Sequence, residues 1–183
     1  QQDLDGYMSE IFFELINSEH IHSADRVDDH LDNPAWVADA VSRWGWDADL
    51  PKAELVRLKS LRSTLRRSVE ELMANGAIGD DRLVELNGFL SNVSVTHELG
   101  RDETGALELK VSSQGRLPSP VIAQSFAEFV TSADVSRLKL CENTNCRWAF
   151  VDTTRNKSKK WCSSAACGNL TKVRRFRAKK SAQ

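Results

Sequence analysis

The sequence has 183 residues, of which 40 % are hydrophobic and 28 % charged, and its formal net charge at pH 7 is −1. This composition is typical of a soluble globular chain, long enough for one domain with a small appendage, and no apolar run approaches the length of a membrane span. The amino-terminal stretch QQDLDGYMSE lacks the charged and then apolar pattern of a signal peptide, so we expect a cytoplasmic protein with no membrane contact.

The first 140 residues predict a mainly helical body, because apolar residues recur at helical spacing in successive segments. Caps and breakers mark the ends of these segments. The expected helices are one from Tyr7 to about Ser18, one opened by Asn33 and Pro34 and stopped by Gly45, a long one from Pro51 to Asn75 and Gly76, one capped by Asp80 that carries Leu83, Leu86 and Leu90, and one opened by Pro118 and Pro120.

Before the last of these helices, the pattern changes to alternation, which predicts one β-hairpin around the turn GRDETG (100–105). The alternating residues are Val93, Val95, His97 and Leu99 on one side of the turn and Leu107, Leu109 and Val111 on the other.

Three groups of residues in the body invite a functional interpretation, and for each we favour a structural one. The histidines and aspartates of the polar stretch 18–30 could form a metal or catalytic cluster, but we expect a solvated loop. The tryptophans could line a ligand pocket, but their helical spacing favours core packing. Asn17 lies beside an apolar stripe, so we expect it to be buried with hydrogen bonds to the backbone. The residues concerned are His20, His22, His30, Asp25, Asp28, Asp29, Trp36, Trp44 and Trp46.

All four cysteines lie in one short segment, at Cys141, Cys146, Cys162 and Cys167. Four thiols confined in this way argue against a disulfide framework in a cytosolic chain. Two equal C-x4-C pairs, separated by fifteen residues, can supply the four tetrahedral thiolates that zinc prefers. Unpaired core cysteines and a redox pair are weaker alternatives. Four protein ligands leave no open position, so we expect one structural zinc ion.

The residues between and after the cysteines predict a treble-clef-like finger. We expect Arg147–Val151 to form a strand, Lys160 and Trp161 to return beside it, and Ser163 or Ser164 to cap a helix that reaches about Lys179. The fold class is therefore mostly α, with a multihelical body, one β-hairpin and a small C-terminal zinc finger.

Charge is divided unevenly along the chain. Residues 141–183 hold eleven Lys and Arg against Glu142 and Asp152, a formal charge of +9, whereas the other 140 residues carry −10. Such a basic end on an acidic body indicates contact with nucleic-acid phosphates, although a solvated tail is an alternative.

Helical geometry divides the basic end into faces. We expect Ala166, Leu170, Val173 and Phe176 to face the finger or the body. The candidate nucleic-acid contacts are Lys172, Arg174, Arg175 and Lys179 on the helix, and Arg155, Lys157, Lys159 and Lys160 in the finger's turn.

With these residues in view, the C-terminal segment resembles the CGNR zinc-finger family. Cys141 and Cys146 match its knuckle, Trp161 and Cys162 its W-C pair, and Cys167, Gly168 and Asn169 its name motif. The strand residues Phe150 and Asp152 also match. The fourth motif residue is Leu170 here instead of arginine. We expect Leu170 to keep the finger folded, and Asp152 to pair with another cation such as Arg155 or Arg174.

The upstream residues resemble the ABATE domain, a family of stress-induced transcription regulators. The resemblance rests on residues 14–18, on Leu61, Arg62, Leu65 and Arg66, and on the pair Leu86 and Asn87. It implies an ABATE-like domain at 1–137 and the finger at 138–183.

The leading functional prediction is a zinc-containing DNA-binding transcriptional regulator, in which the acidic N-terminal domain senses a ligand or a protein partner. An RNA-binding factor is an alternative, since phosphate contacts do not distinguish the two nucleic acids. A protein-interaction module, whose basic face docks an acidic surface, is another. The sequence contains no nucleophile elbow, dinucleotide fingerprint or P-loop, so we do not expect an enzyme.

Overall fold

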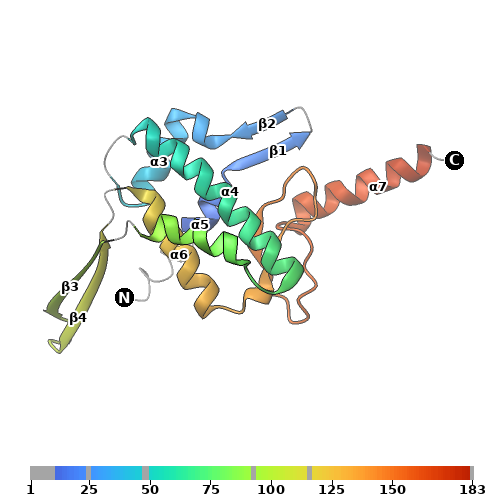
Figure 1. Cartoon of the computed structure of the whole chain (residues 1–183). Helices are drawn as coiled ribbons and strands as arrows, with labels where there is room; N and C mark the ends of the chain where they lie inside the picture. The colour runs from blue at the N-terminus through green and yellow to red at the C-terminus, as the bar shows by residue number, and fades with distance from the viewer. Residues whose placement is uncertain (1–10, 24–25, 47–49, 92–93, 115–116, 182–183) are drawn as a thin grey trace.

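A computed structural model describes residues 11–23, 26–46, 50–91, 94–114 and 117–181. The described elements are, in chain order, α2 (Ile11–Ile16), β1 (Glu19–Ser23), β2 (Arg26–Asp29), the 3-10 turn η1 (His30–Asp32), α3 (Pro34–Arg43), α4 (Lys52–Asn75), α5 (Asp80–Leu90), β3 (Ser94–Arg101), β4 (Leu107–Gln114), α6 (Pro118–Ser132), the 3-10 turn η2 (Val135–Arg137), β5 (Leu138–Leu140), β6 (Ala149–Val151), the π-helical turn η3 (Ser164–Gly168) and α7 (Asn169–Ser181). The predicted fold class, a mostly α body with a small C-terminal finger, is confirmed (Figure 1).

The body is built around the long helix α4. Its apolar stripe of Leu58, Leu61, Leu65 and Val69 is fully buried. The short helix α2 and the helix α6 pack against this stripe, and the rings of Phe12 and Phe126 meet edge to face across that contact with centroids 5.4 Å apart. Burial of this stripe, rather than intrinsic propensity, therefore fixes the helices of the body.

The predicted helix ends are confirmed where the capping residues are specific. The Asn33 Oδ1 accepts hydrogen bonds from the backbone at the start of α3, and Gly76 ends α4 with a φ of +71°, a left-handed conformation that favours glycine. Asp80 is the first residue of α5 rather than its cap, a position that Gly79 takes without a side-chain bond. Leu83 is 43 % exposed, because α5 buries only Leu86 against the body. Tyr7 lies outside the described residues.

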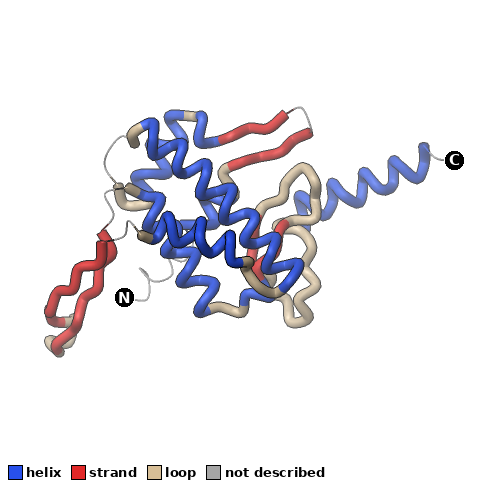
Figure 2. The backbone as a smooth tube through the Cα atoms, viewed as in Figure 1, coloured by secondary structure: helices blue, strands red, loops and turns tan. Residues whose placement is uncertain are grey.

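The hairpin β3–β4 is confirmed, with eight residue pairs from Ser94 opposite Gln114 to Arg101 opposite Leu107. It projects from the body as a separate two-stranded arm (Figures 1 and 2). Val93 lies outside the described residues. The expectation of one hairpin in the body is wrong, since β1–β2 is a second antiparallel pair there. The remaining described pair, β5–β6, belongs to the finger, where a hairpin was expected.

The polar stretch that we expected to be a solvated loop is the β1–β2 hairpin. Tertiary ion pairs explain the difference. The two carboxylate oxygens of Asp29 each accept a hydrogen bond of 2.7 Å from a terminal nitrogen of Arg62. Asp29 also accepts a hydrogen bond from the Leu31 N–H and so caps the start of η1. Arg62 is almost fully buried on α4, so Asp29 is held against the core, whereas Asp28 of the same strand is exposed. The side chain of His22 and the whole of Asp25 lie outside the described part.

The tryptophans follow the core interpretation. Trp44 is buried, and Trp36 and Trp46 pack partly buried against the same core. No helix among the described residues has the length and apolar character needed to cross a bilayer.

Candidate metal centre and basic surface

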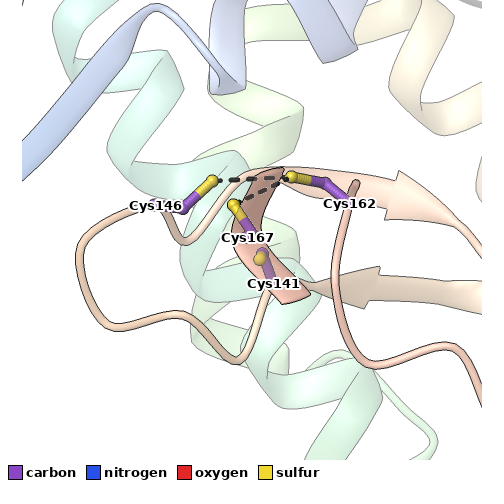
Figure 3. Close-up of side chains that lie close together, drawn as sticks. All are labelled: Cys141, Cys146, Cys162 and Cys167. Atoms are coloured by element: carbon purple, nitrogen blue, oxygen red, sulfur yellow. Dashed lines mark hydrogen bonds between the residues drawn. The ribbon is translucent and has the colours of Figure 1, made fainter. Parts of the chain in front are cut away.

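The four cysteines come together at one point, as Figure 3 shows. Their Sγ atoms all lie within 4.8 Å of one another. The Sγ of Cys162 is 3.6 Å from that of Cys146 and 3.7 Å from that of Cys167. All four thiols are free, and no disulfide joins them in this structure. Within the described residues this is the one group of three or more His, Cys, Asp or Glu with such spacing.

The first pair is held by the knuckle between β5 and β6. Cys141 follows β5, and its backbone N–H donates to the Trp148 carbonyl at 2.8 Å. A tight turn then returns the chain, because the Cys146 N–H donates to the carbonyl of Asn143 and Arg147 has a φ of +55°. The two thiols of the first pair consequently face the same side of the knuckle (Figure 3).

The second pair arrives from the opposite side. The Glu142 N–H donates to the carbonyl of Lys160 at 2.9 Å, which places Cys162 beside the knuckle. Cys167 lies in η3, where Ser163 is the cap residue and its Oγ accepts from the Ala166 N–H, as predicted. Gly168 lies against the ring of Trp161, since a Cβ added at this position would be 3.4 Å from the ring, an ordinary van der Waals contact.

The sulfur geometry fits a zinc ion. Four thiolates at about 2.3 Å from a tetrahedral ion lie about 3.8 Å from one another, which is close to the 3.6 Å between the sulfurs of Cys146 and Cys162 and the 3.7 Å between those of Cys162 and Cys167. Cys141, Cys146 and Cys167 are buried, and the rings of Trp148, Phe150 and Trp161 surround the cluster. The candidate ligands at this centre are the four cysteine sulfurs. Four protein ligands would fill the tetrahedral coordination sphere of zinc and leave no position for substrate or water, which is typical of a structural site.

The pKa values of the thiols show how burial and neighbouring groups affect their ionisation. Burial raises the pKa of Cys146 well above its ordinary value and, with the nearby Cys141, raises the pKa of Cys162 to about 12. Burial also opposes ionisation of Cys167, but hydrogen bonds from Asn143 and the other thiols outweigh it and lower the pKa of Cys167. Burial therefore opposes ionisation of Cys146 and Cys162, and a central cation would supply the charge that four thiolates require.

The finger's strand partner differs from the prediction. β6 pairs with β5, with Leu138 opposite Val151 and Leu140 opposite Ala149, and not with Lys160 and Trp161. The reason is that Leu138 and Ala149 are both buried in the core of the helical body. The hairpin of the finger is consequently shared between the metal centre and the body.

Asp152 organises the finger's turn from a fully buried position. Its carboxylate accepts from Lys139 Nζ at 2.7 Å and from the backbone N–H groups of Thr154 and Lys159. Burial opposes its ionisation, but these bonds outweigh it and hold the pKa of Asp152 far below its ordinary range. The expected pairing with Arg155 or Arg174 is wrong, because Lys139 on β5 lies directly opposite Phe150 and reaches the carboxylate first.

Three of the four candidate basic residues of the turn have partners within the finger or its linker. Lys157 forms an ion pair with Asp134 at 2.9 Å. Lys159 lies over the ring of Phe150, and Lys160 forms a looser pair with Glu142. Arg155 is exposed and has no ion pair with any described residue. Of the four turn residues predicted to contact nucleic acid, Arg155 is therefore the most available.

On α7 the expected apolar arc is exposed. Leu170, Val173 and Phe176 are 51 %, 45 % and 69 % exposed, and Ala166 is also exposed. The expectation that Leu170 keeps the finger folded is wrong, because α7 leaves η3 and points away from the body (Figure 1). One side chain ties it back, since Arg174 Nη1 donates to Asn143 Oδ1 at 3.2 Å. Lys172 is exposed, and the side chains of Arg175 and Lys179 lie outside the described part.

Two residues important to this centre escaped the sequence analysis. Lys139 forms the ion pair with Asp152. Asn143 accepts the backbone hydrogen bond from Cys146 that closes the turn of the knuckle, and its side-chain oxygen accepts a hydrogen bond from Arg174. Asn143 follows the first cysteine by two residues, where an asparagine signals a tight turn. Lys139 gave no such signal, because only the β5–β6 register places it beside Asp152.

Comparison with protein families gives two matches that follow one another along the chain. A family model described as "Putative stress-induced transcription regulator" (ABATE) matches residues 10–133, and one described as "CGNR zinc finger" matches residues 137–180. Among curated proteins nothing matches.

Proposed function

The chain belongs to the ABATE family and carries a CGNR zinc finger, and from this premise we propose that it is a zinc-dependent transcriptional regulator that binds phosphates of duplex DNA through its basic C-terminal segment. The family descriptions name a regulator and a finger and no enzymatic activity. Binding of DNA, the contact residues and the sensing role are our proposal.

One observation carries it: α7 stands clear of the body (Figure 1), and those of its basic side chains that the structure describes are exposed. Thirteen residues of α-helix are about 20 Å long, and a helix of this size fits the major groove. The described exposed cations of α7 are Lys172, Arg174, Arg177 and Lys180. Because few acidic groups lie in the segment 141–183, phosphates would be attracted along the length of the helix.

We divide the predicted contacts by the partners that they already have. Lys172 on α7 and Arg155 in the turn are exposed and have no ion pair with a described residue, so they are proposed as main phosphate contacts. Arg175 and Lys179, whose side chains lie outside the described part, are added to them from their helical positions alone. Lys157, Lys159 and Lys160 have partners in the finger, so their contacts would come at the expense of those interactions. Arg174 bonds to Asn143 and would mainly orient α7.

We propose Cys141, Cys146, Cys162 and Cys167 as the four ligands of one structural zinc ion. When bound, zinc ties the knuckle to η3 and so fixes where α7 begins. The protein's own residues then aim the helix: Ser163 caps η3, Gly168 packs on Trp161, and Arg174 reaches the knuckle.

We assign the ABATE-like domain, residues 1–137, the role of sensor or partner domain, and the finger to residues 138–183. A cytoplasmic location stays a prediction. With a formal charge of −10 in residues 1–140, the body is expected to compete weakly with DNA for the basic helix.

The protein-interaction alternative has one observation in its favour. Leu170, Val173 and Phe176 form an exposed apolar arc beside the basic residues, and such an arc suits an apolar protein surface better than it suits phosphates. RNA also stays an alternative, because phosphate contacts alone do not select DNA.

The test is a titration of labelled duplex DNA, structured RNA and single-stranded DNA with the full zinc-loaded chain at two salt concentrations. Replacing Lys172, Arg175 and Lys179 by alanine should flatten the slope of log affinity against log salt on duplex by about 0.9 for each lost contact. The Lys52→Ala variant, an exposed lysine on the distant start of α4, serves as control and should leave the slope unchanged. Tighter binding to RNA would favour the RNA alternative, and no salt-sensitive binding to any probe would leave the protein-interaction module.

A further inference from the structure

A cavity of about 710 Å³ lies between α4, α5 and the residue that precedes α6. This volume is in the range of small-molecule sites. Its apolar wall includes Ala53, Val56, Phe89 and Leu117. The cavity shares no residue with the cysteine cluster or with α7, so the proposed nucleic-acid contact leaves it without a role.

Glu54 lines this cavity from the first turn of α4 and is only 2 % exposed. Its Oε1 accepts from the Ser119 N–H at 2.8 Å, at the start of α6. Its Oε2 is buried without a hydrogen-bond partner, and no ion pair with a described cation compensates the carboxylate. A buried carboxylate oxygen in this condition is costly unless a donor, best a cationic one, reaches it.

Arg57 lines the same cavity one helical turn further along α4. Its guanidinium lies over the ring of Phe89, 5.2 Å from the centroid, and its Nη2 donates to the Gly88 carbonyl at 3.3 Å. Its Nε is buried and has no acceptor. The other charged pair in the wall is already matched, since Arg67 and Glu85 bind each other. Two residues of the cavity wall thus each carry one buried polar atom without a hydrogen-bond partner, an acceptor on Glu54 and a donor on Arg57.

We infer that this cavity binds a small apolar molecule that carries a cationic donor and an anionic acceptor close together, the chemistry of an apolar α-amino acid. The ammonium group meets Glu54 Oε2, the carboxylate meets Arg57 Nε, and the apolar part lies against Val56 and Leu117. Residues three apart on a helix rise about 4.5 Å along its axis, a separation that adjacent ammonium and carboxylate groups can span. The inference deepens the sensor role proposed above and rests on it for its regulatory meaning.

The test uses the full zinc-loaded chain without nucleic acid, so that failure here leaves the DNA proposal standing and failure of DNA binding leaves this site standing. The probe is L-phenylalanine. Two analogues serve as comparisons: 2-phenylethylamine lacks the carboxylate, and 3-phenylpropionate lacks the ammonium group. Binding is followed by the amide NMR shifts of Ala53, Gly88 and Phe89. L-phenylalanine should bind more tightly than either analogue, with the shifts centred on these residues.

Two variants connect binding to the cavity. Glu54→Gln keeps an oxygen for the Ser119 N–H but places an NH2 donor at the position of the unmatched oxygen. The affinity for L-phenylalanine should therefore fall at least about 10-fold. Gly88→Leu puts a side chain into open space on a helix, where no atom lies within 4 Å of the added Cβ, and should block the cavity without loss of fold. Val84→Leu, on the same helix but outside the wall, is the matched control and should bind normally.

Absence of shifts at the cavity residues would overturn the inference. So would equal binding of L-phenylalanine and 3-phenylpropionate, or unchanged binding by the folded Gly88→Leu variant. If Glu54→Gln is destabilised, the Gly88→Leu result decides.

Discussion

Asn17 joins the helical body to the finger through both ends of its side-chain amide. Its Nδ2 donates to the Ala149 carbonyl at 3.1 Å, and its Oδ1 accepts from the Ala149 N–H at 2.7 Å, so the amide pairs with β6 as a neighbouring strand would. The predicted bonding of Asn17 to the backbone is thereby confirmed, but the residue is half-buried rather than buried. Close by, Arg147 of the knuckle pairs with Glu70 of α4, and the His20 ring meets Trp148 edge to face.

Asn17→Ala should lower the free energy of unfolding by about 1–3 kcal/mol, because it leaves the N–H and the carbonyl of Ala149 without their partner. Asn87→Ala, at an exposed position on α5, provides the control and should change stability little. Chemical denaturation of the zinc-loaded proteins measures both. Equal stability of the two variants would show that the amide pair contributes nothing.

Zinc removal, or Cys162→Ser, should unfold the finger while α4 and its neighbours stay folded. Structural zinc contributes about 10–16 kcal/mol in small fingers, and the segment 141–168 has few apolar contacts besides those around the cluster. Amide exchange should become fast between Cys141 and Gly168. Ala149 is expected to keep more protection than Cys162, because β6 packs on the body. Protection throughout the finger after zinc removal would contradict this prediction.

The ion pair between Asp29 and Arg62 predicts a loss of stability in acid. Burial opposes ionisation of Asp29, but the hydrogen bonds and charge of Arg62 outweigh it and lower the pKa of Asp29 to about 2. A carboxylate whose pKa is depressed in the folded state stabilises the fold above its unfolded pKa of about 3.9, and that contribution disappears as the pH falls toward 2. It amounts to about 2.6 kcal/mol.

Asp29→Asn should therefore lose about this much stability at pH 7 and show a flatter decline of stability between pH 4 and 2. Asp81→Asn, at an exposed position on α5, should keep the decline of the unmodified chain. Parallel acid curves for all three proteins would be incompatible with the assigned role of Asp29.

How far the sequence predicts this structure depends on whether the signal is local. The stripe of α4, the Asn33 cap and the left-handed Gly76 were predictable, because helix periodicity and backbone sterics act over a few residues. The four cysteines were predictable from their spacing. The β1–β2 hairpin was not, since the burial of Arg62 on α4 decides that Asp29 lies against the body.

The same limit applied to the finger. Lys139 became the partner of Asp152 through strand register, and the exposure of Leu170 depends on the direction in which α7 leaves η3. Neither the pairing of Lys139 with Asp152 nor the exposure of Leu170 can be predicted from residues that are neighbours in the sequence. Helical spacing placed Leu170, Val173 and Phe176 on one arc but could not tell whether anything covers it.

Lys139 and Asp152 should show strong coupling. Lys139→Met leaves a fully buried carboxylate without its cation, so each of Lys139→Met and Asp152→Asn is expected to be destabilising. The double variant should be more stable than the sum of the two single effects indicates. A thermodynamic cycle of the four proteins by denaturant unfolding measures the coupling. Simple additivity would mean that the pair contributes no net interaction.

Leu170→Arg restores the family residue at an exposed site, so it should change stability by no more than about 0.5 kcal/mol. If α7 contacts DNA, the added charge should steepen the slope of log affinity against log salt by up to about 0.9. Leu170→Gln serves as the neutral control. A destabilised Leu170→Arg variant would show instead that the side chain is covered in solution.

The bond between residues 17 and 149 also bears on the order in which the chain acquires its structure during synthesis. Leu138 and Ala149 complete a core whose first members, Phe12 and Leu15, leave the ribosome more than a hundred residues earlier. At about 5–20 residues per second, the nascent helices wait roughly 6–30 seconds with one side of that core uncovered. Chaperone contact is therefore expected to persist until β6 has emerged, and a ribosome stalled before residue 149 should hold a protease-sensitive body.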